Sequence, residues 1–219
     1  MDNSRAVSSN QTERHPDLLV KLLNHLNTDY QRPIPDVAEK IFADTKATIA
    51  EIERPLIFDS GCGVGLSTEI LARQHPDHWI IGIDQSEHRL TKQRKNPSPE
   101  NMLLIRANCV DFWRLALTDG WKLDKHYLLF PNPWPKKHHL QRRWHGHPVF
   151  PDMINLKGQL ELRTNWHMYA WEMQTVLEYM NFPTSEVETY LPVAEYLTPF
   201  EQKYHESGQT LYRLTADLS

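Results

Sequence analysis

The chain has 219 residues, 40% of them hydrophobic and 24% charged, which is the composition of a folded protein large enough for one α/β domain. A net charge of −4 argues against a protein whose whole surface coats nucleic acid, and two cysteines, Cys62 and Cys109, are too few for a disulfide framework or a zinc ribbon. No apolar run approaches the roughly 20 residues of a membrane span, and the polar N-terminus has no secretory signal pattern, so we expect a cytoplasmic protein.

The first 54 residues predict a helical extension rather than part of a sheet. Residues 1–15 are polar and are expected to form a loose arm. Leucines spaced three and four apart predict an amphipathic helix over residues 17–26, and a second helix is predicted over residues 36–52, after Pro33 and Pro35. We therefore divide the chain into an N-terminal arm with helices (1–54) and a main domain (55–219).

From Pro55 onward, short apolar runs alternate with helical patterns. This alternation is typical of βαβ units and predicts a doubly wound, Rossmann-like parallel sheet with helices on both faces. The last part of the chain differs, because two strand-like runs flank one short helix there. The expected strands are 56–58, 79–83, 102–105, 126–130, 159–162, 185–190 and 209–215, and the expected helices of this domain are 67–73, 166–179 and 199–205.

A glycine-rich loop follows the first expected strand. Asp59, Gly61, Gly63 and Gly65 form an acid-x-G-x-G-x-G pattern at a strand-to-helix turn, where glycine lets the backbone approach a ligand closely. A dinucleotide fingerprint requires its third glycine one position later, where the chain has Leu66. The spacing instead resembles motif I of S-adenosylmethionine-dependent methyltransferases, although glycines at such turns also occur without a ligand.

Polar residues also follow the next two expected strands. Asp84 ends the second strand, and a carboxylate there can accept hydrogen bonds from both ribose hydroxyls of a nucleoside. Asn108 and Cys109 follow the third strand, where methyltransferases of this class contact adenine. Each residue could also be a simple helix cap. Together with the glycine loop, they predict that S-adenosylmethionine is the cofactor.

The fourth expected strand runs into Pro131-Asn132-Pro133-Trp134-Pro135, which we call the proline segment. Its prolines stiffen the chain at the carboxyl end of a strand, where ligands bind in open α/β sheets. Such stiffness would fix Asn132 and Trp134 beside the cofactor, although a rigid connector would have the same composition.

The proline segment and the residues after it, up to Arg143, resemble the F-P-D-P-W-P-K-K-R-H-x-K-R-R signature of the tRNA (guanine-N7)-methyltransferase family. Residues 163–169 resemble its T-D-x-x-x-Y motif, and residues 198–201 resemble its T-x-F-E motif. The resemblance covers about residues 55–215, and the order of the three later motifs makes it specific to this family.

The resemblance implies roles for individual residues. The catalytic position is Asn132, which is also expected at the cofactor. The other expected cofactor contacts are Asp59, Gly61, Gly63, Gly65, Asp84, Asn108 and Cys109. The expected substrate contacts are Lys136, His139, Arg142, Asn165, Thr198, Phe200 and Glu201. At Asn132 and Asn165 the family has aspartate, and asparagine brings an amide donor but no negative charge.

Residues 125–151, the basic strip, contain no aspartate or glutamate. The strip is expected to bind RNA phosphates, with Trp134 or Trp144 stacking on a base, although a solvated basic face would look the same. We expect no metal site, because neither cysteine nor a carboxylate lies among its histidines. The residues in question are Lys125, Lys136, Lys137, Arg142, Arg143, His126, His138, His139, His145 and His147. Trp166, Tyr169 and Trp171 are expected in the core.

The predicted activity is S-adenosylmethionine-dependent methylation of guanine N7 in tRNA, at the variable-loop guanine that the family modifies. Two alternatives stay open because of the two asparagines. One is a related enzyme that methylates another RNA or a small molecule, and the other is an RNA-binding relative that has lost turnover. The sequence leaves open the oligomeric state and the role of residues 1–54, and it predicts no membrane or metal partner.

Overall fold

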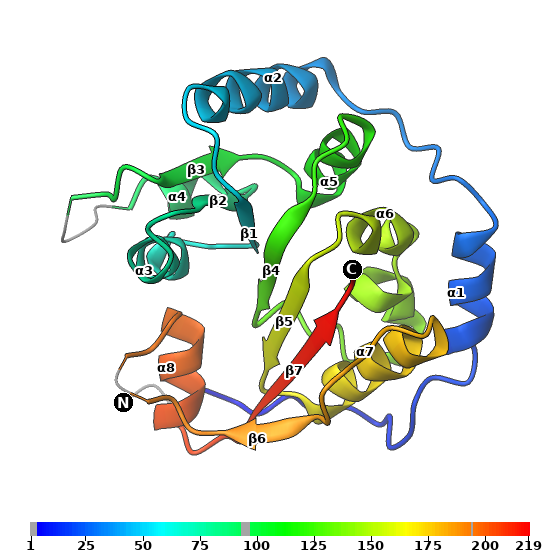
Figure 1. The fold of residues 1–219 in the computed structure, drawn as a ribbon. Helices are drawn as coiled ribbons and strands as arrows, with labels where there is room; N and C mark the ends of the chain where they lie inside the picture. Colours follow the sequence, from blue (N-terminus) through cyan, green and yellow to red (C-terminus); the bar gives the residue numbers. More distant parts are fainter. Residues whose placement is uncertain (1–3, 93–96, 194) are drawn as a thin grey trace.

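The computed structural model describes residues 4–92, 97–193 and 195–219, and within these residues seven strands form one sheet in the order β3-β2-β1-β4-β5-β7-β6 (Figure 1). Strands β1 to β5 are parallel, β7 is antiparallel to β5, and β6 is antiparallel to β7. The strands are β1 (Leu56–Ser60), β2 (Trp79–Asp84), β3 (Met102–Arg106), β4 (Leu123–Leu129), β5 (Gln159–Thr164), β6 (Glu188–Tyr190) and β7 (Leu211–Asp217).

Helices connect the parallel strands and cover both faces of the sheet. The α-helices are α1 (Leu18–Leu26), α2 (Asp36–Ala50), α3 (Leu66–Gln74), α4 (Glu87–Leu90), α5 (Cys109–Thr118), α6 (Phe150–Asn155), α7 (His167–Tyr179) and α8 (Pro199–Glu206). Much of the basic strip folds into the 3-10 helices η1 (Lys137–Arg142) and η2 (Trp144–Gly146). None of the helices in the described ranges is long and apolar enough to cross a bilayer.

The alternation of side chains along β1 shows why the sheet needs two helical layers. Ile57 packs in one buried cluster with Leu71 of α3, whereas its neighbour Phe58 packs on the opposite face, with its ring 5.6 Å from that of Phe112 in α5. Successive side chains of a strand point to opposite faces, so a strand that is apolar at every position must be covered twice. The predicted doubly wound α/β fold is confirmed.

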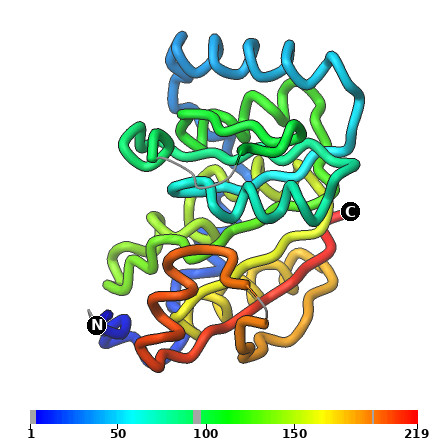
Figure 2. The backbone as a smooth tube through the Cα atoms, turned by 90° about the vertical axis from the view of Figure 1, so that its left-hand side faces the viewer, coloured from blue at the N-terminus to red at the C-terminus, as the bar shows by residue number. Residues whose placement is uncertain are grey.

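The N-terminal extension shares the core of the main domain. Leu18 and Leu22 of α1 are fully buried and belong to the same apolar cluster as Phe112. The expectation of a loose arm is wrong for residues 4–15, which we call the N-terminal arm. Its Ser4 amide donates to Ser207 Oγ, and Figure 2 shows the start of the described chain, in blue, near the orange-red helix α8 (Pro199–Glu206).

The strand order positions the site. Along the sheet, β1 lies between β2 and β4, so the connections that leave β1 and β4 run to opposite sides. A crevice forms at such a switch point, outside the carboxyl ends of the strands. The glycine loop follows β1 and the proline segment follows β4, so the topology brings both to this crevice.

Candidate active site

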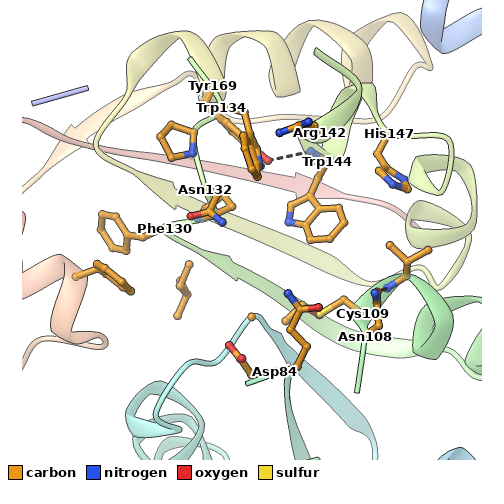
Figure 3. Close-up of a pocket in the computed structure, with 18 of the residues that line it drawn as sticks. Asp84, Asn108, Cys109, Phe130, Asn132, Trp134, Arg142, Trp144, His147 and Tyr169 are labelled. Carbon is orange, nitrogen blue, oxygen red and sulfur yellow. Dashed lines mark hydrogen bonds between the residues drawn. The ribbon is translucent and has the colours of Figure 1, made fainter. Parts of the chain in front are cut away.

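A cavity of about 580 Å³ opens at the carboxyl ends of β1, β2 and β4, a size typical of small-molecule sites. Its walls come from the glycine loop, the start of α5, the proline segment, the two 3-10 helices and α8. In Figure 3, Asp84 and Asn108 approach the cavity from one side, and Asn132 and Trp144 approach it from the other. The cavity therefore joins the expected cofactor residues to the proline segment.

The glycine loop takes a backbone path that favours glycine. Gly61, Gly63 and Gly65 have φ values of 81°, 60° and 79°, in the left-handed region. A Cβ atom at Gly61 or Gly63 would meet no atom within 4 Å, so the loop presents bare backbone on that side. Gly61 lines the cavity, whereas Gly63 and Gly65 shape the turn behind it.

Asp84 has its carboxylate fixed at the cavity edge. Its Oδ1 accepts from the Ser86 amide at 2.8 Å, and its Oδ2 accepts from the Gly63 amide at 3.0 Å. Arg89 Nη1 donates to the same Oδ2 at 3.1 Å. Three donors thus occupy the carboxylate, and Arg89 is the one among them that is a partly exposed side chain.

Asn108 and Cys109 begin α5 at the cavity wall. Asn108 Oδ1 accepts from the Val110 amide at 2.9 Å and so caps the helix. Burial raises the pKa of the Cys109 thiol to about 12, so this group is a neutral thiol at physiological pH. The two residues therefore offer the cavity a shaped, uncharged wall.

Asp59 does not line the cavity, contrary to the direct cofactor contact that the family implies. Its Oδ2 accepts hydrogen bonds from Ser67 Oγ at 2.6 Å and Thr68 Oγ1 at 2.7 Å. Burial raises the pKa of Asp59 to about 6. In this structure its carboxyl group joins β1 to the start of α3 beneath the glycine loop.

The proline segment is held in a strained conformation. Phe130 and Trp134 have φ values of 51° and 47°, which non-glycine residues rarely adopt. The Phe130 amide donates to the Arg163 carbonyl at 2.8 Å, and the Trp134 carbonyl accepts from Arg143 Nε at 3.2 Å. Between these two anchors Asn132 is exposed and lines the cavity.

The two tryptophans proposed to stack on a base have different neighbours in the structure. The Arg142 guanidinium lies 4.7 Å from the centre of the Trp134 ring and covers one of its faces. Trp144 packs edge-on against the buried Trp113, with ring centres 4.7 Å apart. Both tryptophans and Arg142 line the cavity.

The basic strip is not a uniformly solvated surface. Arg143 and His145 are both 0% exposed and both contact the Glu172 carboxylate, with His145 Nε2 at 3.0 Å. Arg143 also stacks 4.8 Å from the centre of the Trp166 ring. The expected phosphate role of Arg143 is therefore wrong for this structure. The exposed lysines and arginine of the strip are Lys136, Lys137 and Arg142.

The expected substrate residues fall into two groups. Arg142 and Phe200 line the cavity, whereas Lys136 and His139 lie beside it, outside its lining. Asn165 is held by a hydrogen bond from its Nδ2 to Gln209 Oε1 at 2.9 Å, away from the lining.

Thr198 and Glu201 form the start of α8 rather than the cavity wall. Thr198 Oγ1 accepts from the Glu201 amide at 2.9 Å, and Glu201 Oε2 accepts from the Leu197 amide at 2.6 Å. Arg163 Nη1 donates to Glu201 Oε1 at 2.8 Å, and the Glu201 side chain is 0% exposed. A substrate contact for Glu201 does not fit this burial, because its carboxylate is already engaged by protein donors.

The cavity residues that the sequence analysis missed include Arg32, Arg89, Phe130 and Tyr204. Tyr204 could have been found, because it lies four residues after Phe200 on the expected helix, and the two rings stack with centres 6.0 Å apart. Arg89 follows Asp84 by five residues, which placed it near the same strand end. Arg32 comes from the α1–α2 connection, for which the sequence offered no guide.

The comparisons with known proteins agree with this geometry. Residues 53–214 match the family model Methyltransf_4, described as "Putative methyltransferase". The chain is 30% identical over 200 residues to a protein named tRNA (guanine-N(7)-)-methyltransferase from Neisseria meningitidis serogroup C, covering 86% of this chain and 83% of that protein. It is 27% identical over 171 residues to a protein of the same name from Lysinibacillus sphaericus, covering 73% and 78%.

Solved structures share the fold. The chain superposes on the 16S rRNA methyltransferase KamB with a TM-score of 0.58 and 17% identity, covering 81% of this chain and 93% of that structure. It superposes on the antibiotic-resistance methyltransferase Kmr with a TM-score of 0.53 and 21% identity, covering 80% and 92%. At this level of identity the likeness shows a common sheet and helix arrangement.

Proposed function

Because the chain belongs to the tRNA (guanine-N7)-methyltransferase family, we propose that it transfers the methyl group of S-adenosylmethionine to N7 of a guanine in tRNA. One observation carries the proposal. A single cavity joins Asp84 and the glycine loop to Asn132 on the proline segment. The expected cofactor residues and the expected base-binding residue therefore line the same cavity, which supports the proposal.

The residues present fit the cofactor. The backbone at Gly61 leaves room where a side chain would stand, and Asp84 and Asn108 stand at the ends of the next two strands. Asp84 would hold the ribose, Asn108 and Cys109 would line the adenine, and Gly61 would lie against the methionine portion. The bound cofactor supplies an electrophilic methyl group on a positively charged sulfur.

Guanine N7 is an sp² nitrogen with a free lone pair, so its methylation requires no base to remove a proton. The protein contributes by positioning the guanine and stabilising the charge that develops on it. The Asn132 amide offers one acceptor and one donor to the edge of the base. Burial lowers the pKa of His147 to about 4, so this cavity residue is neutral at pH 7 and adds no repulsion to the positive charge.

The RNA site is proposed to lie beside the cavity. Lys136, Lys137 and Arg142 are exposed and would contact phosphates. In an RNA helix, N7 lies in the major groove, which is too narrow for side chains to read. The target guanine is therefore expected in a loop, such as the variable loop that the family modifies. This function would place the protein with tRNA in the cytoplasm.

Transfer of a labelled methyl group from S-adenosylmethionine to purified tRNA tests the proposal. We expect label in tRNA, and none when the cofactor is replaced by S-adenosylhomocysteine. Absence of label at saturating cofactor would contradict the proposed substrate.

A second candidate is favoured by one observation: Asn132 faces the cavity without the negative charge of the family's aspartate. The enzyme would then methylate another RNA or a small molecule. Labelling of tRNA-depleted RNA or of a metabolite extract, with tRNA unlabelled, identifies that case. Calorimetric binding of tRNA and S-adenosylhomocysteine without any methylated product identifies an RNA-binding relative.

A further inference from the structure

The N-terminal arm contacts the proline segment, although the two are far apart in the sequence. Ser9 Oγ donates to the Pro135 carbonyl at 2.7 Å, and the Gln11 amide donates to Ser9 Oγ at 3.0 Å. Pro131, Pro133 and Pro135 have no N–H group, so carbonyl oxygens are the main backbone groups by which this segment can be held. The arm uses one of these carbonyls directly.

Gln11 reaches a second carbonyl of the segment through Arg143. Gln11 is 6% exposed, and its Oε1 accepts from Arg143 Nη2 at 3.0 Å. Arg143 in turn donates from Nε and Nη2 to the Trp134 carbonyl, at 3.2 and 3.1 Å. Trp134 has a positive φ of 47°, which is a strained backbone conformation for a residue other than glycine. Such a conformation persists only where surrounding contacts hold it in place.

The charges around Gln11 explain why an amide stands there. Arg143 and Glu172 are both 0% exposed and form an ion pair, so the buried group has one positive and one negative charge. Gln11 Nε2 donates to Glu172 Oε1 at 2.6 Å, while its oxygen accepts from Arg143. The His15 amide also donates to Glu172 Oε1, at 2.8 Å. A neutral side chain with one donor and one acceptor satisfies both ions without adding charge.

We infer that Ser9 and Gln11 are positioning residues of the active site, which hold the Trp134 and Pro135 carbonyls so that Asn132 faces the cofactor residues across the cavity. The effect on catalysis rests on the proposed function, whereas the effect on the proline segment does not. The N-terminal arm is therefore a working part of the site, not a mobile appendage to the methyltransferase domain.

Hydrogen–deuterium exchange tests whether the N-terminal arm holds the proline segment in place. The variants are Ser9→Ala and Gln11→Ala, and the controls are Ser8→Ala and Asn10→Ala, whose side chains are exposed on the same arm. We expect amide exchange in peptides covering residues 130–143, in which the Phe130, His139 and Arg143 amides are hydrogen-bonded, to rise at least fivefold in the first pair and to stay at the wild-type rate in the controls. Exchange in β2 should not change. Equal exchange of the proline segment in all variants would overturn the inference.

Steady-state kinetics test whether these contacts of the N-terminal arm increase the rate of methyl transfer. We expect Ser9→Ala and Gln11→Ala to lower kcat about tenfold, since displaced groups lose alignment, while the Kd of S-adenosylhomocysteine stays within twofold. Ser9→Thr retains the hydroxyl group and should restore kcat. Faster exchange with an unchanged kcat would refute the positioning role. Wild-type protein that methylates no tRNA would contradict the proposed function, and the exchange experiment would still decide whether the arm holds the segment.

Discussion

Asp84 combines two tasks that a single carboxylate can perform. It orders the glycine loop by accepting a hydrogen bond from the Gly63 amide, and it can accept a further hydrogen bond from a ligand in the cavity. Arg89 shares the carboxylate through a side chain that is 45% exposed, whereas the side chain of Asp84 is 4% exposed. Under the proposed function, the ribose hydroxyls would compete with Arg89 for this carboxylate.

Replacing Asp84 with asparagine tests this role. Asp84→Asn keeps the size of the side chain but gives the ribose hydroxyls one neutral acceptor in place of a charged pair. We expect the Kd of S-adenosylhomocysteine to rise about 10- to 100-fold, as measured by calorimetry. Glu87→Gln, on the exposed α4 turn beside it, is the control and should bind as the wild type does. Wild-type affinity in Asp84→Asn would exclude the proposed ribose contact.

Asn132 is the residue at which this chain departs most informatively from its family. Asn132→Asp restores a carboxylate facing the cavity, where positive charge develops on guanine. A charged acceptor strengthens a hydrogen bond by about 1 kcal/mol, so we expect kcat on tRNA to be preserved or to rise up to about tenfold. Single-turnover methyl transfer measures this. A large loss of tRNA methylation would indicate that asparagine is required and would favour a different substrate.

Among the helices and strands, α8 is held to the sheet by Glu201. The Glu201 carboxylate does not face a substrate. Glu201 accepts from Arg163 of β5 and Tyr190 of β6, so one carboxylate joins three elements. A residue that the family motif assigns to substrate is here a structural link between the sheet and the helix that carries Phe200 and Tyr204 to the cavity.

Glu201→Gln distinguishes a structural role from a substrate role. We expect the free energy of unfolding to fall by about 1–3 kcal/mol, because the buried donors lose a charged acceptor. Urea unfolding at pH 7 measures it, and Glu206→Gln, exposed on the same helix, is the control. The Kd of S-adenosylhomocysteine should stay within twofold. Unchanged stability together with a higher KM for tRNA would instead support the substrate role.

Elements with strong local patterns could be predicted, and long-range polar contacts could not. The continuous apolar runs of β1, β2 and β4 predicted their strands, because a doubly covered strand is apolar at every position. The N-terminal arm looked loose because its polar residues found no local partner. Gln11 is ordered by Arg143, 132 positions away, and Arg143 is buried by Glu172, 29 positions away. No spacing rule connects such pairs.

The site residues that could be predicted from the sequence are those that lie at the carboxyl ends of strands. Asp84 ends its strand, Asn108 and Asn132 follow theirs at the same edge of the sheet, and all three line the cavity. The motifs predict ligand contacts for Asp59 and Glu201, but in the folded chain Asp59 Oδ2 is bound by Ser67 and Glu201 Oε1 by Arg163. A motif fixes where a residue stands on the chain, whereas burial decides which groups its side chain meets.

At the scale of the whole molecule, buried titratable groups link stability to pH. Burial lowers the pKa of His126 to about 3, and its Nε2 lies 2.8 Å from Ser60 Oγ beneath the site. The folded protein therefore keeps His126 neutral, while the unfolded chain binds a proton below pH 6.5. Stability falls as the pH decreases from 6.5 toward 3.

His126→Gln measures that contribution, since glutamine can bond to Ser60 but does not titrate. Between pH 7 and pH 5 we expect wild-type protein to lose about 2 kcal/mol more unfolding free energy than His126→Gln. Urea unfolding at both pH values gives this difference, and titration of other groups cancels in the comparison. An equal pH dependence of the two proteins would show that His126 binds its proton as readily in the folded protein as in the unfolded chain.

The position of the transferred methyl group decides whether the protein methylates guanine N7 in tRNA. Unmodified tRNA is incubated with the purified protein and S-adenosylmethionine and digested to nucleosides, and the methylated guanosines are separated and identified by mass spectrometry. We expect 7-methylguanosine in amounts that increase with enzyme and that disappear in Asp84→Asn at limiting cofactor. Methylation at another atom or base, or a digest without any methylated nucleoside, would contradict it.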